Sequence, residues 1–154
     1  MCYRSRRGYV APDRAVCEDL HVSSTESPRR TILVVDDERI VALELQHALA
    51  VLGFLVPATA ASCADALALA EVNPPQIVLM DLHLRGPVDG IDTARQLRER
   101  FDFGLVYMTG GVDAAQRARA SVTNPAAWLQ KPYTQLQLEQ ALRVAEAKLR
   151  TQTG

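Results

Sequence analysis

The stretch Thr31-Ile-Leu-Val-Val-Asp-Asp37 decides the fold, because it joins an unbroken apolar run to a pair of acidic residues. A continuous β-branched run is typical of a strand that is buried on both faces, as in a parallel sheet. A helical pattern follows at once, with apolar side chains on one stripe at positions 41, 45, 48, 49 and 52. Gly53 is expected to end that helix. The two patterns together predict a βα unit.

The same alternation continues to the end of the chain. Further strands are predicted at Phe54–Val56, Gln76–Met80, Leu105–Met108 and Ala126–Gln130. Helices are predicted from the Ser62 cap through Glu71, from Asp89-Gly90 through Phe101, from about 113 to 122, and from about 138 to 149. Five βα units in series predict an α/β fold, a doubly wound five-stranded parallel sheet between five helices.

Length and composition indicate one globular domain. The chain has 154 residues, of which 48% are hydrophobic and 23% charged, as in ordinary globular proteins. Residues 31–150 carry the alternating pattern and are predicted to form the domain. Residues 1–30 contain six arginines without a regular apolar period, so we expect a disordered N-terminal extension. Residues 151–154 are predicted to be a short tail.

Charge and cysteine content exclude several classes of protein. The formal net charge is −1, so no strong field favours nucleic acid or an anionic membrane. No apolar run is long enough for a membrane span, and no signal-peptide core is present. The three cysteines, Cys2, Cys17 and Cys63, have spacings that indicate neither a disulfide framework nor a zinc site. A cytoplasmic protein is therefore predicted.

Five polar residues directly follow predicted strands. Asp36 and Asp37 follow the first strand, Asp81 the third, Thr109 the fourth and Lys131 the fifth. The carboxyl ends of parallel strands meet at one edge of the sheet, where such folds collect their functional groups. We therefore expect these five side chains to share one pocket.

The predicted pocket has the charges of a phosphoryl-transfer site. Three carboxylates repel one another, and Mg²⁺ prefers a few carboxylates together with water and phosphate oxygens. Asp81 is a candidate nucleophile for a phosphoryl group. Lys131 and Mg²⁺ are expected to stabilise the transferred group, and the Thr109 hydroxyl is expected to donate a hydrogen bond to it.

Plainer readings exist for each residue alone. Asp36 or Asp37 could cap the helix that follows, Thr109 could be an ordinary strand end, and Lys131-Pro132 could be a stiff loop. The cluster of Arg95, Arg98 and Arg100 is interpreted as a solvated helix face. The joint pattern of Asp36, Asp37, Asp81 and Lys131 is harder to explain in these ways.

Residues 31–150 resemble the receiver domain of bacterial two-component response regulators. The resemblance rests on five motifs in order: Val34-Val-Asp-Asp-Glu38, Leu79-Met-Asp-Leu82, Asp89-Gly90-Ile91, Met108-Thr109-Gly110 and Gln130-Lys-Pro132. It implies a flavodoxin-like sheet with strand order 2-1-3-4-5. It also implies a response regulator of a phosphorelay that works as a switch and not as an enzyme.

The resemblance assigns roles by position. Asp81 matches the phosphoacceptor. Asp36, Asp37, Asp81 and the backbone carbonyl of His83 match the Mg²⁺ ligands. Thr109 and Lys131 match the switch residues that hold the acyl phosphate. Trp128 stands three residues before Lys131, at the aromatic switch position, where switching and plain packing are both open readings.

Partners follow from the same resemblance. The donor is expected to be a histidine kinase or a histidine phosphotransfer protein, and an unknown downstream protein is expected to bind near the fifth strand. Since no further pattern follows the last helix, the chain is predicted to be a stand-alone receiver without an output domain. A homodimer through the last strand and helices is compatible with the family.

Two other functions compete with this one. The first is a receiver-like protein–protein adaptor that is not phosphorylated. The second is a phosphatase with an aspartyl-phosphate intermediate, which is disfavoured because His83 occupies the position of the usual second aspartate. Nucleotide enzymes are disfavoured because neither GxxxxGK[ST] nor GxGxxG occurs.

Overall fold

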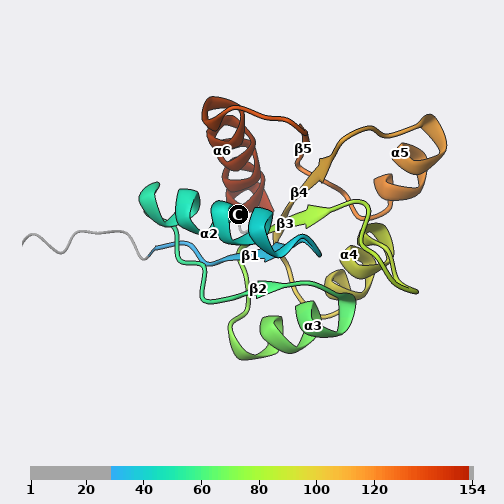
Figure 1. Ribbon diagram of the computed structural model, residues 1–154, viewed down its shortest axis with the longest axis horizontal. Helices are drawn as coiled ribbons and strands as arrows, with labels where there is room; N and C mark the ends of the chain where they lie inside the picture. Colours follow the sequence, from blue (N-terminus) through green and yellow to red (C-terminus); the bar gives the residue numbers. More distant parts are fainter. Residues whose placement is uncertain (1–28, 153–154) are drawn as a thin grey trace, which may run out of the picture.

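A computed structural model describes residues 29–152, and within them five parallel strands alternate with five helices (Figure 1). The strands lie in the order β2-β1-β3-β4-β5, which confirms the predicted fold. The elements are β1 (Ile32–Val35), α2 (Arg39–Val51), β2 (Thr59–Ala60), α3 (Cys63–Val72), β3 (Ile77–Asp81), α4 (Gly90–Arg98), β4 (Gly104–Thr109), α5 (Ala114–Ser121), β5 (Ala127–Gln130) and α6 (Gln135–Gln152).

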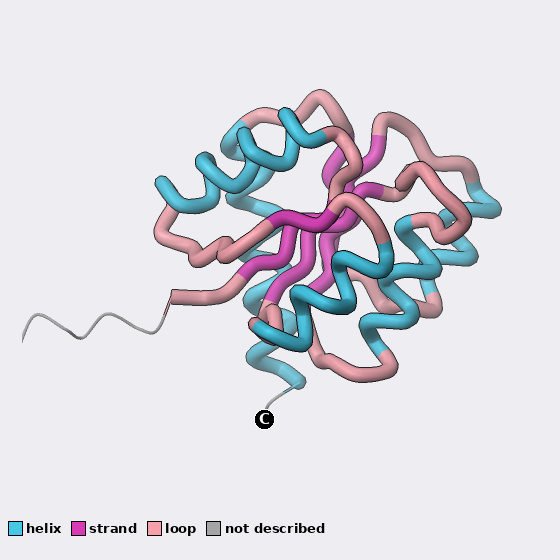
Figure 2. The backbone as a smooth tube through the Cα atoms, turned by 60° about the horizontal axis from the view of Figure 1, so that its bottom comes forward, coloured by secondary structure: helices cyan, strands magenta, loops and turns pink. Residues whose placement is uncertain are grey.

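The sheet separates two apolar cores. Helices α2 and α6 cover one face, and α3, α4 and α5 cover the other (Figures 1 and 2). Every residue of β1, β3 and β4 is buried, as the continuous apolar runs predicted. The central strands are therefore rigid supports for whatever follows their carboxyl ends.

The second strand is not where the sequence predicted it. The prediction of a strand at Phe54–Val56 was wrong, because β2 is Thr59–Ala60, and Leu55 makes only an isolated parallel bridge to Thr31. Pro57 lies between the two pairings and has no N–H to donate to a sheet. The edge segment has one more residue than β1 between its two pairings, so its register shifts there and it pairs again only after Ala58.

Helix ends follow the predicted signals. Ser62 accepts a hydrogen bond from the Asp65 N–H at 3.2 Å, and Asp89 accepts one from the Asp92 N–H at 2.9 Å. Asp113 forms a reciprocal capping box with Gln116. Such caps satisfy N–H groups that have no partner inside the helix. The predicted helix starts are thereby fixed by side-chain chemistry.

Arg98 differs from the solvated face that the sequence suggested. Its guanidinium lies 4.2 Å from the ring centroid of Phe103. It also donates to the backbone carbonyls of Phe103, at 2.5 Å, and Thr123, at 2.9 Å. Arg98 is therefore a structural tie between the end of α4 and the segment that leads into β5. Arg95 and Arg100 make exposed ion pairs, as expected of a helix surface.

The limits of the domain extend slightly past the predicted ones. Helix α6 continues through Gln152, into the predicted tail. Arg30, at the end of the predicted extension, forms an ion pair with Glu146 at 3.0 Å. Residues 1–28, to which the prediction of a disordered extension applies, lie outside the described residues. No helix between residues 29 and 152 is long and apolar enough to cross a membrane.

Gly90 lies against the backbone of Asp81. A Cβ atom at Gly90 would stand 2.0 Å from the Asp81 carbonyl oxygen, a distance that side chains do not tolerate. The first turn of α4 therefore sits directly on the end of β3, and only glycine permits this approach.

We expect Gly90→Ala to lower the free energy of unfolding by about 2 kcal/mol or more, because the clash is with backbone and cannot be relieved by a rotamer change. Urea unfolding followed by circular dichroism measures this loss. Gly110→Ala is the matched control, since no atom lies within 4 Å of its added Cβ. Equal stability of the two variants would contradict the close approach of α4 to β3.

Candidate functional site

Backbone pairing brings the predicted site residues to one edge of the sheet. Asp36 directly follows β1. Asp81, the last residue of β3, is paired with Met108 in β4. The Lys131 N–H donates to the Thr109 carbonyl at 2.8 Å, which sets the ends of β4 and β5 side by side. Residues separated by up to 95 positions thus converge because parallel strands share one carboxyl edge.

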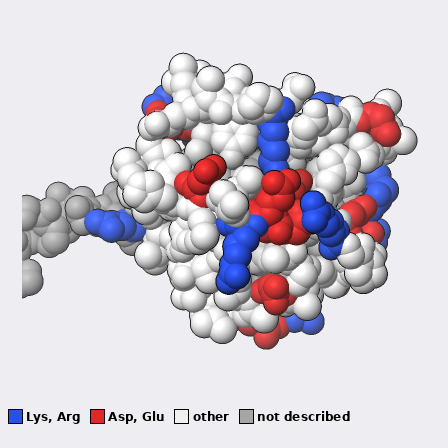
Figure 3. Space-filling view, in the orientation of Figure 1, with Lys and Arg blue, Asp and Glu red and all other residues white. Residues whose placement is uncertain are grey.

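Three carboxylates form the centre of this site. Asp36, Asp37 and Asp81 each offer an oxygen, and these atoms lie within 4.8 Å of one another. Asp36 is 1% and Asp81 5% exposed, so both are largely removed from water. Acidic side chains gather over the ends of β1 and β3, bordered by basic side chains (Figure 3). The cluster combines burial with like charge, which is costly without a cation.

Asp36 also supports the chain at the start of α2. Its Oδ1 accepts a hydrogen bond from the Glu38 N–H at 2.9 Å. Glu38 itself is the N-cap of α2 and makes no side-chain capping bond. Asp36 therefore does not cap α2. Its Oδ1 holds the turn before the helix, and its Oδ2 faces Lys131 in the cluster.

Lys131 supplies positive charge inside the cluster. Its Nζ lies 3.1 Å from Asp36 Oδ2 and 3.6 Å from Asp81 Oδ2. Burial lowers the pKa of the Lys131 ammonium, but the charges of Asp81 and Asp36 outweigh burial and leave the pKa raised. The ammonium is therefore held in its charged form, where it faces the two buried carboxylates.

Asp81 has a raised pKa. Burial is the main cause, and the charges of Asp36 and Asp37 add to it. The His83 N–H, which donates to Asp81 Oδ1 at 3.1 Å, and the Lys131 charge lower the pKa but do not cancel the effect of burial. A further cation in the pocket would therefore favour the charged form of Asp81.

Arg85 is a site residue that the sequence analysis missed. Its Nε lies 3.2 Å from Asp37 Oδ2, and its backbone N–H donates to the same oxygen at 3.3 Å. The Arg85 side chain is 87% exposed, so this cation lies at the mouth of the pocket. The only signal in the sequence was its place in the loop that follows β3.

Thr109 and His83 meet at one backbone carbonyl. The Thr109 hydroxyl donates to the Gly111 carbonyl at 2.6 Å, and the Gly111 N–H donates back to Thr109 Oγ1 at 3.1 Å. The His83 Nε2 lies 3.3 Å from the same carbonyl. The side chain of His83 thus joins the loop after β3 to the loop after β4, while the predicted role of its own carbonyl as a metal ligand stays a prediction.

Trp128 packs against one aromatic and one basic side chain. Its ring packs on Tyr107 with centroids 5.0 Å apart, and the Arg117 guanidinium of α5 lies 4.7 Å from its centroid. The buried Tyr107 hydroxyl pairs with Thr123 Oγ1 at 2.7 Å, and burial raises the pKa of Tyr107 to about 12. Trp128 is therefore packed between a fixed tyrosine and an arginine, and its role as a switch stays a prediction.

The residues present fit a hard divalent cation. Carboxylate oxygens are the ligands that Mg²⁺ prefers, and it is held by few protein groups plus water and phosphate. Asp36, Asp37 and Asp81 supply such oxygens from two strand ends. A cation there would offset the repulsion that one lysine leaves uncompensated.

The fold and the site define a class: flavodoxin-like α/β domains with an acidic, lysine-flanked pocket at the carboxyl edge of the sheet. Over residues 32–143 the chain matches the response regulator receiver domain, and it belongs to that family. Receiver domains of two-component systems are phosphoacceptor switches, bind Mg²⁺ at an acidic pocket, and interact with histidine kinases or phosphotransfer proteins.

Curated relatives are regulatory proteins. The chain is 29% identical over 127 residues to the transcriptional regulatory protein PdtaR of Mycobacterium tuberculosis, covering 82% of this chain and 61% of that protein. It is 34% identical over 104 residues to the photosynthetic apparatus regulatory protein RegA of Cereibacter sphaeroides, covering 67% and 55%. The chain thus spans between half and two thirds of the length of these relatives.

Solved structures support the same fold. The signal receiver domain of a modulated diguanylate cyclase from Desulfovibrio desulfuricans superposes with a TM-score of 0.74 at 28% identity, covering 80% of this chain and 98% of that one. A CheY-like receiver domain from Methanospirillum hungatei gives a TM-score of 0.73 at 19% identity, with 80% and 98% coverage. The second likeness concerns the fold alone.

The raised pKa of Asp81 predicts a pH-dependent cost in the metal-free protein. A raised carboxyl pKa means that the folded state binds this proton more tightly than the unfolded state. This proton therefore stabilises the folded state fully below the unfolded pKa, near 3.8, and the stabilisation is lost as pH rises through the folded pKa. Asp81→Asn, which is always neutral, should therefore be more stable than the wild type at pH 7, and this difference should shrink as pH falls towards 4.

Urea unfolding with a chelator present, at several pH values, measures this difference. Asp102→Asn is the control, because Asp102 is an exposed acid at the opposite edge of the sheet and should give no gain. If the metal-free Asp81→Asn protein is less stable than the wild type at pH 7, the pKa of Asp81 is not raised by folding.

Proposed function

We propose that Asp81 accepts a phosphoryl group from a phosphohistidine of a histidine kinase or phosphotransfer protein. The observation that carries this proposal is the buried Asp81 carboxylate, grouped with Asp36 and Asp37 and 3.6 Å from the Lys131 ammonium. In the reaction an Asp81 oxygen forms a bond to phosphorus as the P–N bond of the donor breaks, and the bonding electrons stay on the donor imidazole. The product is an acyl phosphate.

Each neighbouring residue has a role in this proposal. Asp36, Asp37 and Asp81, with the carbonyl of His83, would hold Mg²⁺, which supplies positive charge for the phosphoryl oxygens. Lys131 stabilises the same oxygens from the β5 side, since its Nζ already faces Asp81. Thr109 directly follows Met108, which pairs with Asp81, so in this proposal its hydroxyl turns towards the phosphoryl group.

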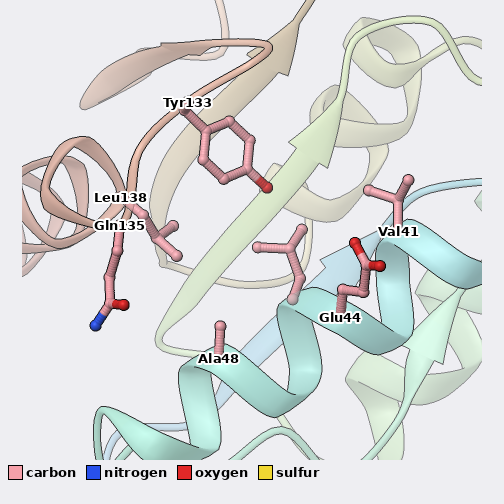
Figure 4. Close-up of a pocket in the computed structure, with 7 residues that line it drawn as sticks. Val41, Glu44, Ala48, Tyr133, Gln135 and Leu138 are labelled. Atoms are coloured by element: carbon pink, nitrogen blue, oxygen red, sulfur yellow. The ribbon is translucent and has the colours of Figure 1, made fainter.

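A pocket next to the site supports the approach of a donor protein. It lies between α2 and the start of α6 and is lined by Val41, Glu44, Leu45, Ala48, Tyr133, Gln135 and Leu138 (Figure 4). Tyr133 stands two residues after Lys131. Apolar walls with a few polar groups suit a helix of a donor protein, and we propose this surface as the donor contact.

We propose that phosphorylation acts on other proteins by changing the binding of a partner near β5. A groove between β5 and α6 is lined by Trp128, Gln137, Gln140 and Val144, among others, and Val144 is half exposed. The loop between β4 and α5 follows Thr109. Movement of this loop would shift α5 and so change the contact between Arg117 and Trp128. A downstream protein, or a second copy of the chain, would then bind this groove with a different affinity.

Phosphorylation is expected to depend on the site residues individually. With Mg²⁺ and acetyl phosphate or phosphoramidate, the wild type should give a retarded band on a Phos-tag gel. Asp81→Asn and Asp37→Ala should give none, because one lacks the nucleophile and the other a metal ligand. Lys131→Ala should be labelled partly, but should show no conformational response. Labelling of Asp81→Asn like the wild type would show that another residue is the acceptor.

The competing adaptor function predicts a different result. An adaptor that is not phosphorylated would show the same unshifted band for the wild type and Asp81→Asn, and partner binding would be independent of Mg²⁺. The retained carboxylates and Lys131 favour the phosphoacceptor, since an adaptor has no need for a buried cluster of like charges. Repeated turnover of p-nitrophenyl phosphate would instead indicate a phosphatase.

Arg85 should weaken Mg²⁺ binding, because its guanidinium neutralises part of the Asp37 charge. Arg85→Met removes this exposed cation and is expected to lower the Mg²⁺ dissociation constant by roughly two- to fivefold. A change of that size corresponds to the free energy of one exposed ion pair. Isothermal titration calorimetry measures it. Arg95→Met is the matched control, because Arg95 pairs with Asp92 on α4 instead. Identical constants for both variants would contradict the prediction.

A further inference from the structure

The Gly111 carbonyl lies between the Thr109 hydroxyl, at the end of β4, and a ring nitrogen of His83, in the loop after β3. Thr109 reaches it from the end of β4, with an Oγ1–O distance of 2.6 Å. His83 reaches it from the loop after β3, with an Nε2–O distance of 3.3 Å. One contact is short and the other is at the long end of the range for hydrogen bonds. The carbonyl is thus mainly bonded to the Thr109 hydroxyl, with the His83 ring nitrogen as a second polar group close by.

The Thr109 hydroxyl can donate only one hydrogen bond at a time. That single proton is directed at Gly111 in this structure, while Oγ1 accepts from the Gly111 N–H at 3.1 Å. Donation from Thr109 to a phosphoryl oxygen on Asp81 therefore requires that the bond to the Gly111 carbonyl be broken. Turning the Thr109 hydroxyl away costs free energy, because the Gly111 carbonyl loses one hydrogen-bond partner.

His83 is placed to offset this cost. Its backbone N–H donates to Asp81 Oδ1 at 3.1 Å, so the residue is anchored at the acceptor while its ring reaches the opposite loop. When Nε2 carries the proton, the ring is a donor to the Gly111 carbonyl. A small movement that shortens the 3.3 Å contact would replace the bond that Thr109 gives up.

We propose that the His83 ring is a positioning residue that takes over the Gly111 carbonyl when Thr109 turns to the phosphoryl group. The inference rests on the proposed function, since it needs a phosphoryl group on Asp81. It assigns His83 an effect on the stability of the phosphorylated state that acts only through Thr109. The ring itself contacts neither the phosphoryl group nor the metal in this proposal.

Beryllofluoride with Mg²⁺, which mimics an aspartyl phosphate, provides the test. Its apparent affinity is measured by NMR titration of the Gly110 and Gly111 amide signals. His83→Phe keeps a ring without a donor, and His83→Gln keeps an N–H donor. His47→Phe is the control, because His47 is an exposed histidine on α2. Thr109→Ala and the double variant with His83→Phe complete a thermodynamic cycle.

We expect His83→Phe to weaken the apparent affinity by roughly two- to tenfold, which corresponds to one net hydrogen bond. His83→Gln should recover most of the loss, and His47→Phe should bind like the wild type. In the Thr109→Ala background, the change at His83 should have no effect, because no hydroxyl leaves the carbonyl.

Two results would overturn the inference while the proposed function stands. One is a wild-type affinity in His83→Phe. The other is a loss that persists in full in the Thr109→Ala background, which would show that the ring supports the loop independently of Thr109. A wild type that does not respond to beryllofluoride with Mg²⁺ would instead refute the proposed function, and this inference with it.

Discussion

Charge balance at the carboxyl edge of the sheet is the constraint on which the rest of the molecule depends. Asp36 and Asp81 are almost fully buried beside Asp37, and one ammonium, that of Lys131, bridges the two buried groups. Buried carboxylates are costly unless they are paired and hydrogen-bonded. The His83 N–H, the Glu38 N–H and the Arg85 guanidinium each satisfy part of that requirement. The loops after β1, β3 and β5 are therefore held together by the same charges that define the site.

The sequence was sufficient where one local rule dominated. The apolar run at 31–35 and the caps Ser62, Asp89 and Asp113 each have a single strong physical interpretation, whereas the polar residues at strand ends gain theirs only as a group. The topology then joined distant residues, because parallel strands leave little freedom in where their carboxyl ends meet. That is why Asp36, Asp81 and Lys131 could be grouped before any geometry was known.

The remainder depended on tertiary contacts that sequence patterns do not encode. Strand β2 was misplaced because a short apolar run near Pro57 resembles a strand, whereas its pairing depends on a register shift against β1. Arg98 was misinterpreted because helix charge patterns do not reveal that the carbonyls of Phe103 and Thr123 accept hydrogen bonds from it. Arg85 and Gly111 contribute through loop geometry, which has no periodic signal. Periodic patterns predict which face of a helix or strand is buried, whereas a loop sequence shows only its composition.

The irregular edge at β2 has a consequence for assembly. An exposed strand edge is a row of unpaired N–H and C=O groups to which another chain can add a strand. Here that edge has only two residues in regular pairing, and Pro57 precedes them without an N–H. The short strand and Pro57 therefore disfavour extension of the sheet on the β2 side. Growth of the sheet between molecules is discouraged at this edge, where contacts with other proteins would instead be made by side chains.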